Sequence, residues 1–104
     1  MEIVFFDKKI AQFIEGLDHS THAKVLHAFD LLERFGATLR MPHSKSLGDS
    51  LFVLRIRGRI DVRLIYVYKT ESAYILHAFI KKSMKPPLKE LWIAQQRLGA
   101  LDRV

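Results

Sequence analysis

The sequence predicts an α+β domain with the element order β-α-α-β-β-β-α and a small, mainly antiparallel sheet. Three observations predict it. Two segments in the first third of the chain space their apolar residues like helices, three apolar runs then follow in close succession, and a last amphipathic segment closes the chain. We expect the first two helices to form a hairpin that covers one face of the sheet, because their apolar sides must be buried.

Size and composition fit one domain over residues 1–104. The apolar fraction of 49% is enough for a core. No apolar run approaches the roughly 20 residues that cross a bilayer, and the short acidic N-terminus is no signal peptide. The chain has no cysteine, which excludes disulfides and thiolate metal sites and fits a reducing cytoplasm. The chain is therefore expected to be cytoplasmic. No membrane partner is expected, because the apolar sides of the amphipathic helices are needed to cover the sheet.

The charge balance is strongly basic, with a net charge of +6 and a pI of about 9.8. In so small a domain this excess favours a polyanionic partner, such as nucleic acid, an anionic membrane surface or an acidic protein. The alternative is that the basic surface serves solubility alone.

The first half of the chain gives a strand over 3–6 and two helices. Asp7 can cap a helix over 8–15, which Gly16 would end. Asp18 or Ser20 can cap a longer helix that ends at Gly36. The apolar stripe of this longer helix consists of Val25, Phe29, Leu32 and Phe35, with Leu26 and Ala28 alongside.

The second half gives a loop, three strands and a helix. Segment 39–50 contains Pro42, Gly48 and Asp49 and is expected to be a loop. The strands are expected at 51–57, 61–68 and 73–80. Pro86 and Pro87 suit the first turn of the last helix, with Gly99 as its stop. One side of this helix is expected to carry Leu88, Leu91, Trp92, Gln95 and Leu98.

Arginines stand among the apolar residues of the first two of these strands. A three-residue loop, 58–60, places Arg55 opposite Arg63 and Arg57 opposite Asp61. A two-residue turn would instead mix charged and apolar residues on both faces, so the longer loop is favoured. Two facing arginines repel each other, which favours an anion between them. Otherwise Arg57–Asp61 is a surface pair and the other arginines extend to water.

The next strand has an ambiguous register. A three-residue turn puts His77 across from Arg63, whereas a turn of two or four residues puts Ala78 there. Lys81 or Lys82, just beyond the strand, could reach the same site in either case.

Four blocks of the sequence resemble one known family. Segments 51–55, 62–66, 76–82 and 86–90 are similar in order and spacing to the core blocks of the RelE/ParE toxin superfamily, with the best match to its HigB-like, phage Gp49-like branch. The resemblance covers residues 3–98. It implies a RelE-like fold and the toxin of a type II toxin–antitoxin system, a ribosome-dependent mRNA endoribonuclease. Such an enzyme needs no metal or other cofactor, because the 2′-OH of the mRNA attacks the adjacent phosphate.

The resemblance also implies roles for single residues and a protein partner. Arg55 occupies the family's basic strand position, Arg63 the position that steadies the scissile phosphate, and Lys81 or Lys82 the basic position after the last strand. The basic residues Arg57, Arg59, His43 and Lys45 are expected to bind RNA, although His43 could simply be a solvated loop residue. The partner implied is an antitoxin from the same operon, acidic or mixed in charge, in a toxin–antitoxin hetero-oligomer.

The sequence departs from the family pattern in three places, and the last of them leaves the general base open. Val53 replaces a glutamate, Phe52 replaces a tryptophan, and Pro87-Leu88 stands where some members carry a catalytic tyrosine. His77 could take the proton, since a near-neutral pKa suits a base, or it could be a packed core residue. Tyr66 and Tyr68 are weaker candidates.

Other signals carry less weight. The three histidines of segment 19–27 lack a carboxylate at matching spacing, so no metal site is expected. Trp92 is expected to pack on the sheet, or else to line an antitoxin groove. Two rival functions stay open, a ParE-like inhibitor of DNA gyrase and a catalytically silent member that binds nucleic acid or an antitoxin.

Overall fold

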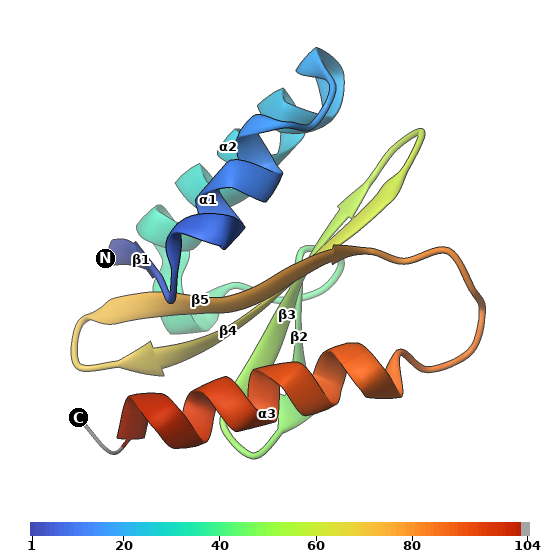
Figure 1. Ribbon diagram of the computed structural model, residues 1–104. Coiled ribbons are helices and arrows are strands. Elements are labelled where there is room, and N and C mark those ends of the chain that lie inside the picture. Colours follow the sequence, from blue (N-terminus) through green and yellow to red (C-terminus); the bar gives the residue numbers. More distant parts are fainter. Residues whose placement is uncertain (103–104) are drawn as a thin grey trace.

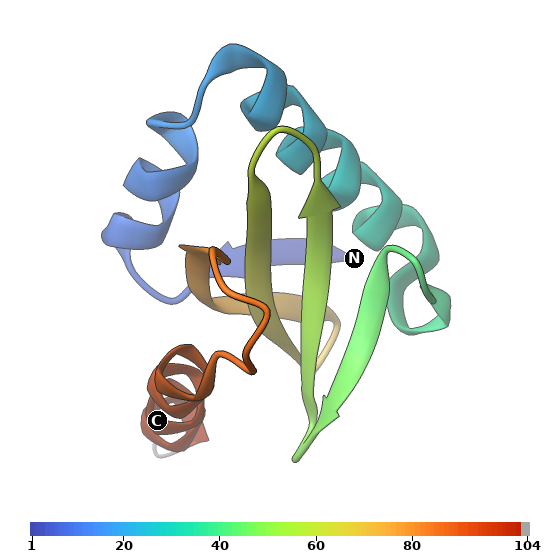
Figure 2. The same ribbon diagram turned by 90° about the vertical axis from the view of Figure 1, so that its right-hand side faces the viewer.

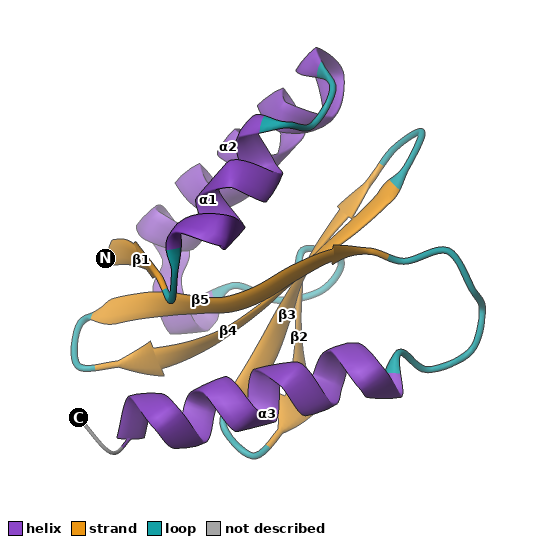
Figure 3. Cartoon of the chain, viewed as in Figure 1, coloured by secondary structure: helices purple, strands orange, loops and turns teal. Residues whose placement is uncertain are grey.

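The computed structural model describes residues 1–102 and has the predicted α+β class. The last two residues of the predicted 1–104 domain lie outside the described residues. The elements are β1 (Glu2–Phe5), α1 (Lys8–Glu15), α2 (His19–Phe35), a 3-10 turn (Gly36–Thr38), β2 (Ser44–Gly48), β3 (Leu51–Arg57), β4 (Asp61–Lys69), β5 (Ser72–Ile80) and α3 (Leu88–Asp102). Figure 3 shows how the strands lie between the helices. None of the helices in the described part of the chain is long and apolar enough to span a bilayer.

The five strands form one sheet in the order β1-β5-β4-β3-β2. Strand β1 runs parallel to β5, and the other neighbours are antiparallel. The α1–α2 hairpin covers one face of the sheet and α3 lies across the other, as Figures 1 and 2 show. The sheet therefore separates two apolar clusters, one beneath the hairpin and one beneath α3.

The two N-terminal helices begin and end where the sequence predicts. The carboxylate of Asp7 accepts a hydrogen bond from the backbone N–H of Ile10, and Asp18 accepts one from that of Thr21, each at 3.1 Å. Each bond satisfies one of the free N–H groups at a helix start. Gly36 ends α2 with φ of +52°, a conformation that a side chain would strain.

The β3–β4 hairpin has the predicted register. Arg55 pairs with Arg63 and Arg57 with Asp61, across the connection 58–60. Alternation then points Leu54 toward the helical hairpin and Val53 toward α3. The arginine pair consequently lies on the α3 face.

The prediction that segment 39–50 is a loop is wrong for residues 44–48, which form the edge strand β2. Its sequence, Ser-Lys-Ser-Leu-Gly, lacks the apolar alternation that reveals a strand, because only Ser44 is buried. An edge strand needs just one neighbour and can remain polar on its open side.

Both registers predicted for β5 are wrong, since Arg63 pairs with Phe79. The β4–β5 turn has two residues, which alone would place Ala78 opposite Arg63. The register shifts by one residue at Ile65–Tyr66, so that Ile65 pairs with His77 and Leu76 is left as the extra residue of a bulge.

Helix α3 differs from prediction in its end and its buried side. It continues through Gly99 to Asp102. Its contacts with the sheet come from Leu91, Ala94, Leu98 and Leu101. The expectation that Trp92 packs on the sheet is wrong, because this residue is 59% exposed. In α2, Leu26 and Phe35 are likewise exposed, although the predicted stripe included both.

Candidate functional site

A cleft of about 340 Å³ opens on the α3 face of the sheet. Four basic side chains line it, those of Lys45, Arg55, Arg63 and Lys81. Its apolar surface comes from the sheet and from the segment that enters α3, and includes Val53, Ile65, Phe79, Pro86, Pro87 and Leu88. Within residues 1–102, none of the residues that line this cleft is acidic. The cleft is therefore suited to an anion that also carries apolar groups.

Neighbouring strands supply the four cations. Lys45 lies on β2, Arg55 on β3 and Arg63 on β4, and Lys81 follows directly after β5. The backbone N–H of Lys81 donates to the carbonyl oxygen of Asp61 at 2.7 Å, which holds the end of β5 beside the start of β4. The sheet thereby brings together residues 36 positions apart in the chain, and three of the predicted catalytic residues share this cleft with one predicted RNA-binding residue.

Arg63 is held in one orientation by a neighbour on its own strand. Its Nε and Nη2 donate to the two carboxylate oxygens of Asp61 at 2.8 and 2.9 Å, and its side chain is 14% exposed. The hydrogen bonds from Arg63 hold the pKa of Asp61 below its usual range, since they favour the ionised carboxylate. Asp61 is thus the ion-pair partner of Arg63, although Arg57 is its cross-strand neighbour.

Arg55 has weaker internal partners. Its Nε is buried, and no atom of the described residues hydrogen-bonds to it. Its Nη1 contacts only the sulfur of Met41, a weak acceptor, at 3.5 Å. A buried donor without a partner is costly in a folded protein. Arg55 also lines the cleft, where none of the described residues gives its guanidinium a carboxylate partner, so its charge is available to an anion.

His77 faces α3 but is not among the cleft residues. Its ring stacks on that of Phe79, with centroids 5.6 Å apart, and its Nε2 lies 3.4 Å from Oε2 of Glu90. Burial lowers the pKa of His77, and the nearby Glu90 carboxylate raises it in part. The structure therefore gives His77 the packed position that was the alternative to its role as a base.

The remaining predicted residues lie elsewhere. His43 and Arg57 line a shallow depression between β3 and α2, which Arg55 also reaches. Arg59 is in the β3–β4 turn, where it lies near the N-cap of α2, and Lys82 is exposed beyond the cleft. These residues do not converge with the four cleft cations.

The two tyrosines belong to the core on the opposite face. The hydroxyl of Tyr66 is hydrogen-bonded to Ser44 Oγ at 2.5 Å, and that of Tyr68 donates to the carbonyl oxygen of Gly36 at 2.8 Å. Burial raises the pKa of Tyr66 far above its usual value. Neither hydroxyl is placed to exchange a proton with an anion in the cleft.

The histidines of segment 19–27 do not form a metal site. Among residues 1–102, no group of three histidine, aspartate or glutamate side chains is close enough to hold a metal ion. The expectation that the protein works without a metal stays a prediction.

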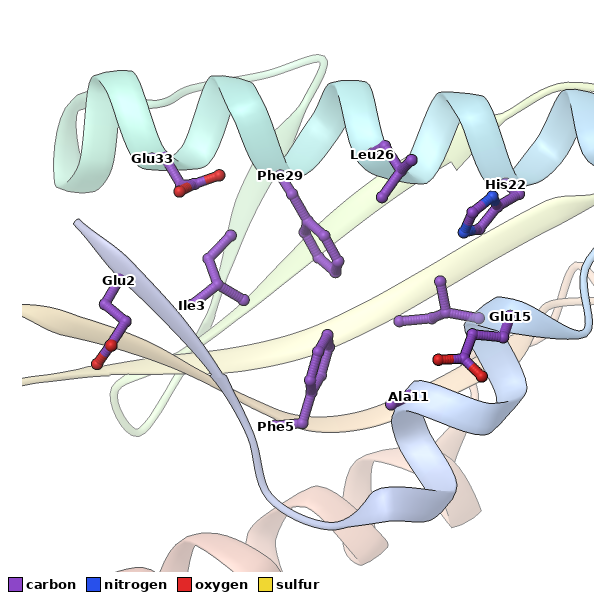
Figure 4. A pocket seen from close by; sticks show the side chains of 10 residues that line it. Glu2, Ile3, Phe5, Ala11, Glu15, His22, Leu26, Phe29 and Glu33 are labelled. Carbon is purple, nitrogen blue, oxygen red and sulfur yellow. The ribbon is translucent and has the colours of Figure 1, made fainter.

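A second cavity, of about 420 Å³, lies on the other face between β1, α1 and α2. Figure 4 shows Ile3, Phe5, Leu26 and Phe29 along this groove, with Glu15 and His22 at one end and Glu33 at the other. Within residues 1–102, no lysine or arginine lines it. Its glutamates would repel a phosphate, so this groove is not a second anion site.

Sequence reasoning missed Asp61 as the partner of Arg63. The signal was available, because residues two apart on a strand point to the same face. It was overlooked because the cross-strand neighbour, Arg57, offered an equally simple pairing.

The sheet, the helical hairpin and the C-terminal helix form a small α+β domain with a basic cleft on one face. The family model described as "Phage derived protein Gp49-like (DUF891)" matches residues 12–99, and the chain belongs to this family. The family is RelE-like and toxin-like, which is consistent with the toxin of a toxin–antitoxin pair and with an antitoxin as partner. A search of curated proteins found no match.

Proposed function

We propose that this protein is the toxin of a type II toxin–antitoxin system, in the HigB-like branch, and that it cleaves mRNA on translating ribosomes. The observation that carries the proposal is the convergence of Arg55, Arg63, Lys45 and Lys81 in one cleft. Two arginines facing each other across a ladder are unfavourable by themselves, and a bound phosphate would remove that cost. RNA supplies both the phosphate and the bases that an apolar wall can contact.

The proposed reaction is an internal transfer within the RNA. The 2′-oxygen attacks the adjacent phosphorus, the bond from phosphorus to the 5′-oxygen breaks, and a 2′,3′-cyclic phosphate and a 5′-hydroxyl result. The proton of the 2′-OH leaves and the 5′-oxygen gains one, so the balance requires no metal or other co-reactant. Negative charge builds up on the phosphoryl oxygens in the transition state. Arg63, already fixed by Asp61, and Arg55 stabilise it without having to reorganise.

The proposed dependence on the ribosome has a physical reason, which is that the described residues lining the cleft include no evident acceptor for the 2′ proton. The ionisable side chains that line the cleft are all cations, and His77 is packed behind Phe79 against Glu90. The cleft can therefore stabilise charge better than it can accept the 2′ proton. We infer that the ribosome supplies the remaining assistance, by holding the mRNA in line for attack. The antitoxin would oppose the reaction by covering the cleft with acidic groups.

His77 does not line the cleft, and this also favours one alternative. A protein that binds RNA in the cleft but lacks a positioned base would be a catalytically silent member that regulates through binding. A gyrase inhibitor is the other rival, but it has no need of a phosphate-binding cluster.

The deciding experiment is a reconstituted bacterial translation reaction with purified protein, in which mRNA ends are mapped by primer extension. Arg63→Ala is the test variant, and Leu26→Ala, an exposed residue of the opposite face, is the matched control. We expect discrete cuts that require ribosomes, persist in Leu26→Ala and disappear in Arg63→Ala. Intact mRNA at high protein concentration would contradict nuclease activity. RNA binding without cuts would then indicate the catalytically silent member. Inhibition of DNA gyrase in a supercoiling assay would indicate the gyrase inhibitor.

A further inference from the structure

Helix α3 carries two large apolar side chains that are exposed. Leu88 is 71% exposed and Trp92 is 59% exposed, while Ala94 on the opposite side is buried. Tryptophan is highly buried on average, because it carries a large apolar surface. An exposed tryptophan on a stable helix offers a large apolar face that a ligand can cover.

The position of Trp92 connects it to the cleft. Leu88 lines the cleft, and Trp92 follows four residues later, so the two side chains lie on the same side of α3 about one helical turn apart. Figure 1 shows that α3 begins directly after the 81–87 loop. A chain that leaves the cleft past Leu88 meets the indole ring next.

The charges around this side of α3 favour a polyanion. Arg97 is turned toward the sheet, where it donates to the carbonyl oxygen of Leu76. Segment 81–92 contains four basic residues, Lys81, Lys82, Lys85 and Lys89. Its one acidic residue, Glu90, is turned toward His77 and is half-buried. The exposed neighbours of Trp92 within one turn include Lys89, Gln95 and Gln96, which donate hydrogen bonds. A flat apolar group attached to a phosphate chain matches this combination of an aromatic ring, cations and amides.

We propose that Trp92 is a stacking site for an unpaired base of single-stranded RNA whose backbone occupies the cleft. This inference rests on the proposed function, and it assigns to that function a contact beyond the phosphate. Stacking on an aromatic side chain tolerates every base, since each has a π face. Trp92 would thus add affinity and hold the strand in register, while the arginines act on the phosphate.

Trp92 is the only tryptophan of the chain, so its fluorescence reports on this site alone. The probe is a six-nucleotide oligouridylate with 2′-O-methyl groups, which cannot be cleaved because its 2′-oxygen carries no proton. Inorganic polyphosphate is the control ligand, with charge and no base. We expect the oligonucleotide to quench the fluorescence, and polyphosphate to displace it while leaving the fluorescence of the free protein unchanged.

Variants separate the ring from the fold. Trp92→Phe keeps an aromatic face and should bind the oligonucleotide within a few-fold of wild type. Trp92→Ala should weaken binding by about 5- to 100-fold, as expected when one base loses its stacking partner. Leu26→Ala should bind as wild type does. Thermal unfolding of each variant confirms that an exposed position has been changed without loss of the fold.

Three outcomes would overturn the stacking site: binding without quenching, equal affinity of Trp92→Ala and wild type, or loss of the antitoxin complex in Trp92→Ala with unchanged RNA affinity. The last would make Trp92 an anchor for protein. Failure of the proposed function can be distinguished from failure of the stacking site. If quenching depends on Trp92 but the protein cuts no mRNA, the stacking site is supported and the proposed nuclease activity is contradicted. Conversely, if the protein cleaves mRNA and Trp92→Ala binds RNA as tightly as the wild type does, only the stacking site is contradicted.

Discussion

The two faces of the sheet each carry a cavity of several hundred Å³ with apolar walls, and they differ mainly in charge. The cleft on the α3 face is lined by four cations, whereas the groove beneath the α1–α2 hairpin has glutamates and no lysine or arginine among its described lining residues. Apolar surface alone therefore says little about the ligand. The sign of the surrounding charge decides which cavity can accept a phosphate.

The faces also differ in what their side chains do for stability. Beneath the hairpin, Val25, Leu32 and Tyr66 are fully buried and belong to one continuous core. On the other face, Arg55 and Arg63 face each other as like charges, and Arg55 Nε is buried without a hydrogen bond. Unfavourable features of this kind gather at functional sites, where ligand binding removes the cost. Substitutions on the two faces should consequently separate stability from activity.

The largest effect is expected from Phe29→Ala beneath the hairpin. Phe29 is 8% exposed and packs against Phe5, with ring centroids 5.9 Å apart. The truncation should lower the free energy of unfolding by about 3–5 kcal/mol, because it removes apolar contacts and leaves a cavity. Chemical denaturation measures this change. Cleavage per folded molecule should stay at the wild-type level, and a loss of activity in fully folded protein would contradict the separation of the two faces.

Arg63→Ala should have the opposite profile. The rate of mRNA cleavage should fall about 10²- to 10³-fold, the usual effect of removing one preorganised donor from a transition state. The fold should persist, because the repulsion from Arg55, up to about 1 kcal/mol, is lost together with the ion pair to Asp61. Single-turnover cleavage on ribosomes and a denaturation curve measure the two effects. Equal cleavage by Arg63→Ala and wild type would remove Arg63 from the site.

Asp61→Asn should split binding from catalysis. Without its charge, residue 61 no longer offsets the cleft cations, so RNA should bind more tightly. Arg63 loses two charge-assisted hydrogen bonds and its fixed orientation, so cleavage should slow by about tenfold. Affinity for an uncleavable oligonucleotide and the single-turnover rate are compared in one preparation. A residue that served the fold alone would move both quantities in the same direction or neither, and Asp61→Glu should recover part of the rate.

How much of this arrangement the sequence predicted depends on the range of the interactions involved. The register of Arg55 against Arg63 was predictable, because a short loop and strict alternation determine it locally. The pairing of Arg63 with Phe79 was not, since it depends on one extra residue at Leu76 that leaves no mark in composition. Strand β2 was missed although its hairpin with β3 is local, because its sequence is polar and has no apolar alternation to mark a strand. The cleft itself needed three-dimensional information, for its cations come from four separate segments.

The smallest effect concerns His77, which lies on the face of the cleft but packs like a core residue. Burial lowers the pKa of His77 and is the largest influence on it. The carboxylates of Glu90 and Asp7 raise this pKa, and the nearby charge of Arg97 lowers it. The unfolded chain therefore binds the proton at a higher pH than the folded protein does. The stability that neutral His77 contributes is complete above pH 6.5 and declines as the pH falls through the lower pKa of the folded state.

His77→Gln should remove this part of the pH dependence and keep a donor for Glu90. The free energies of unfolding of both proteins are measured at pH 7.5 and pH 5.5, and the fall should be smaller in the variant. An equal fall in both would mean that other groups cause it. The same variant also tests whether His77 belongs to the packed core or to the cleft on this face of the sheet. Cleavage at the wild-type rate by His77→Gln would assign His77 to the core. A large loss of cleavage in His77→Gln that does not increase when Arg63→Ala is added would instead make His77 part of the catalytic site.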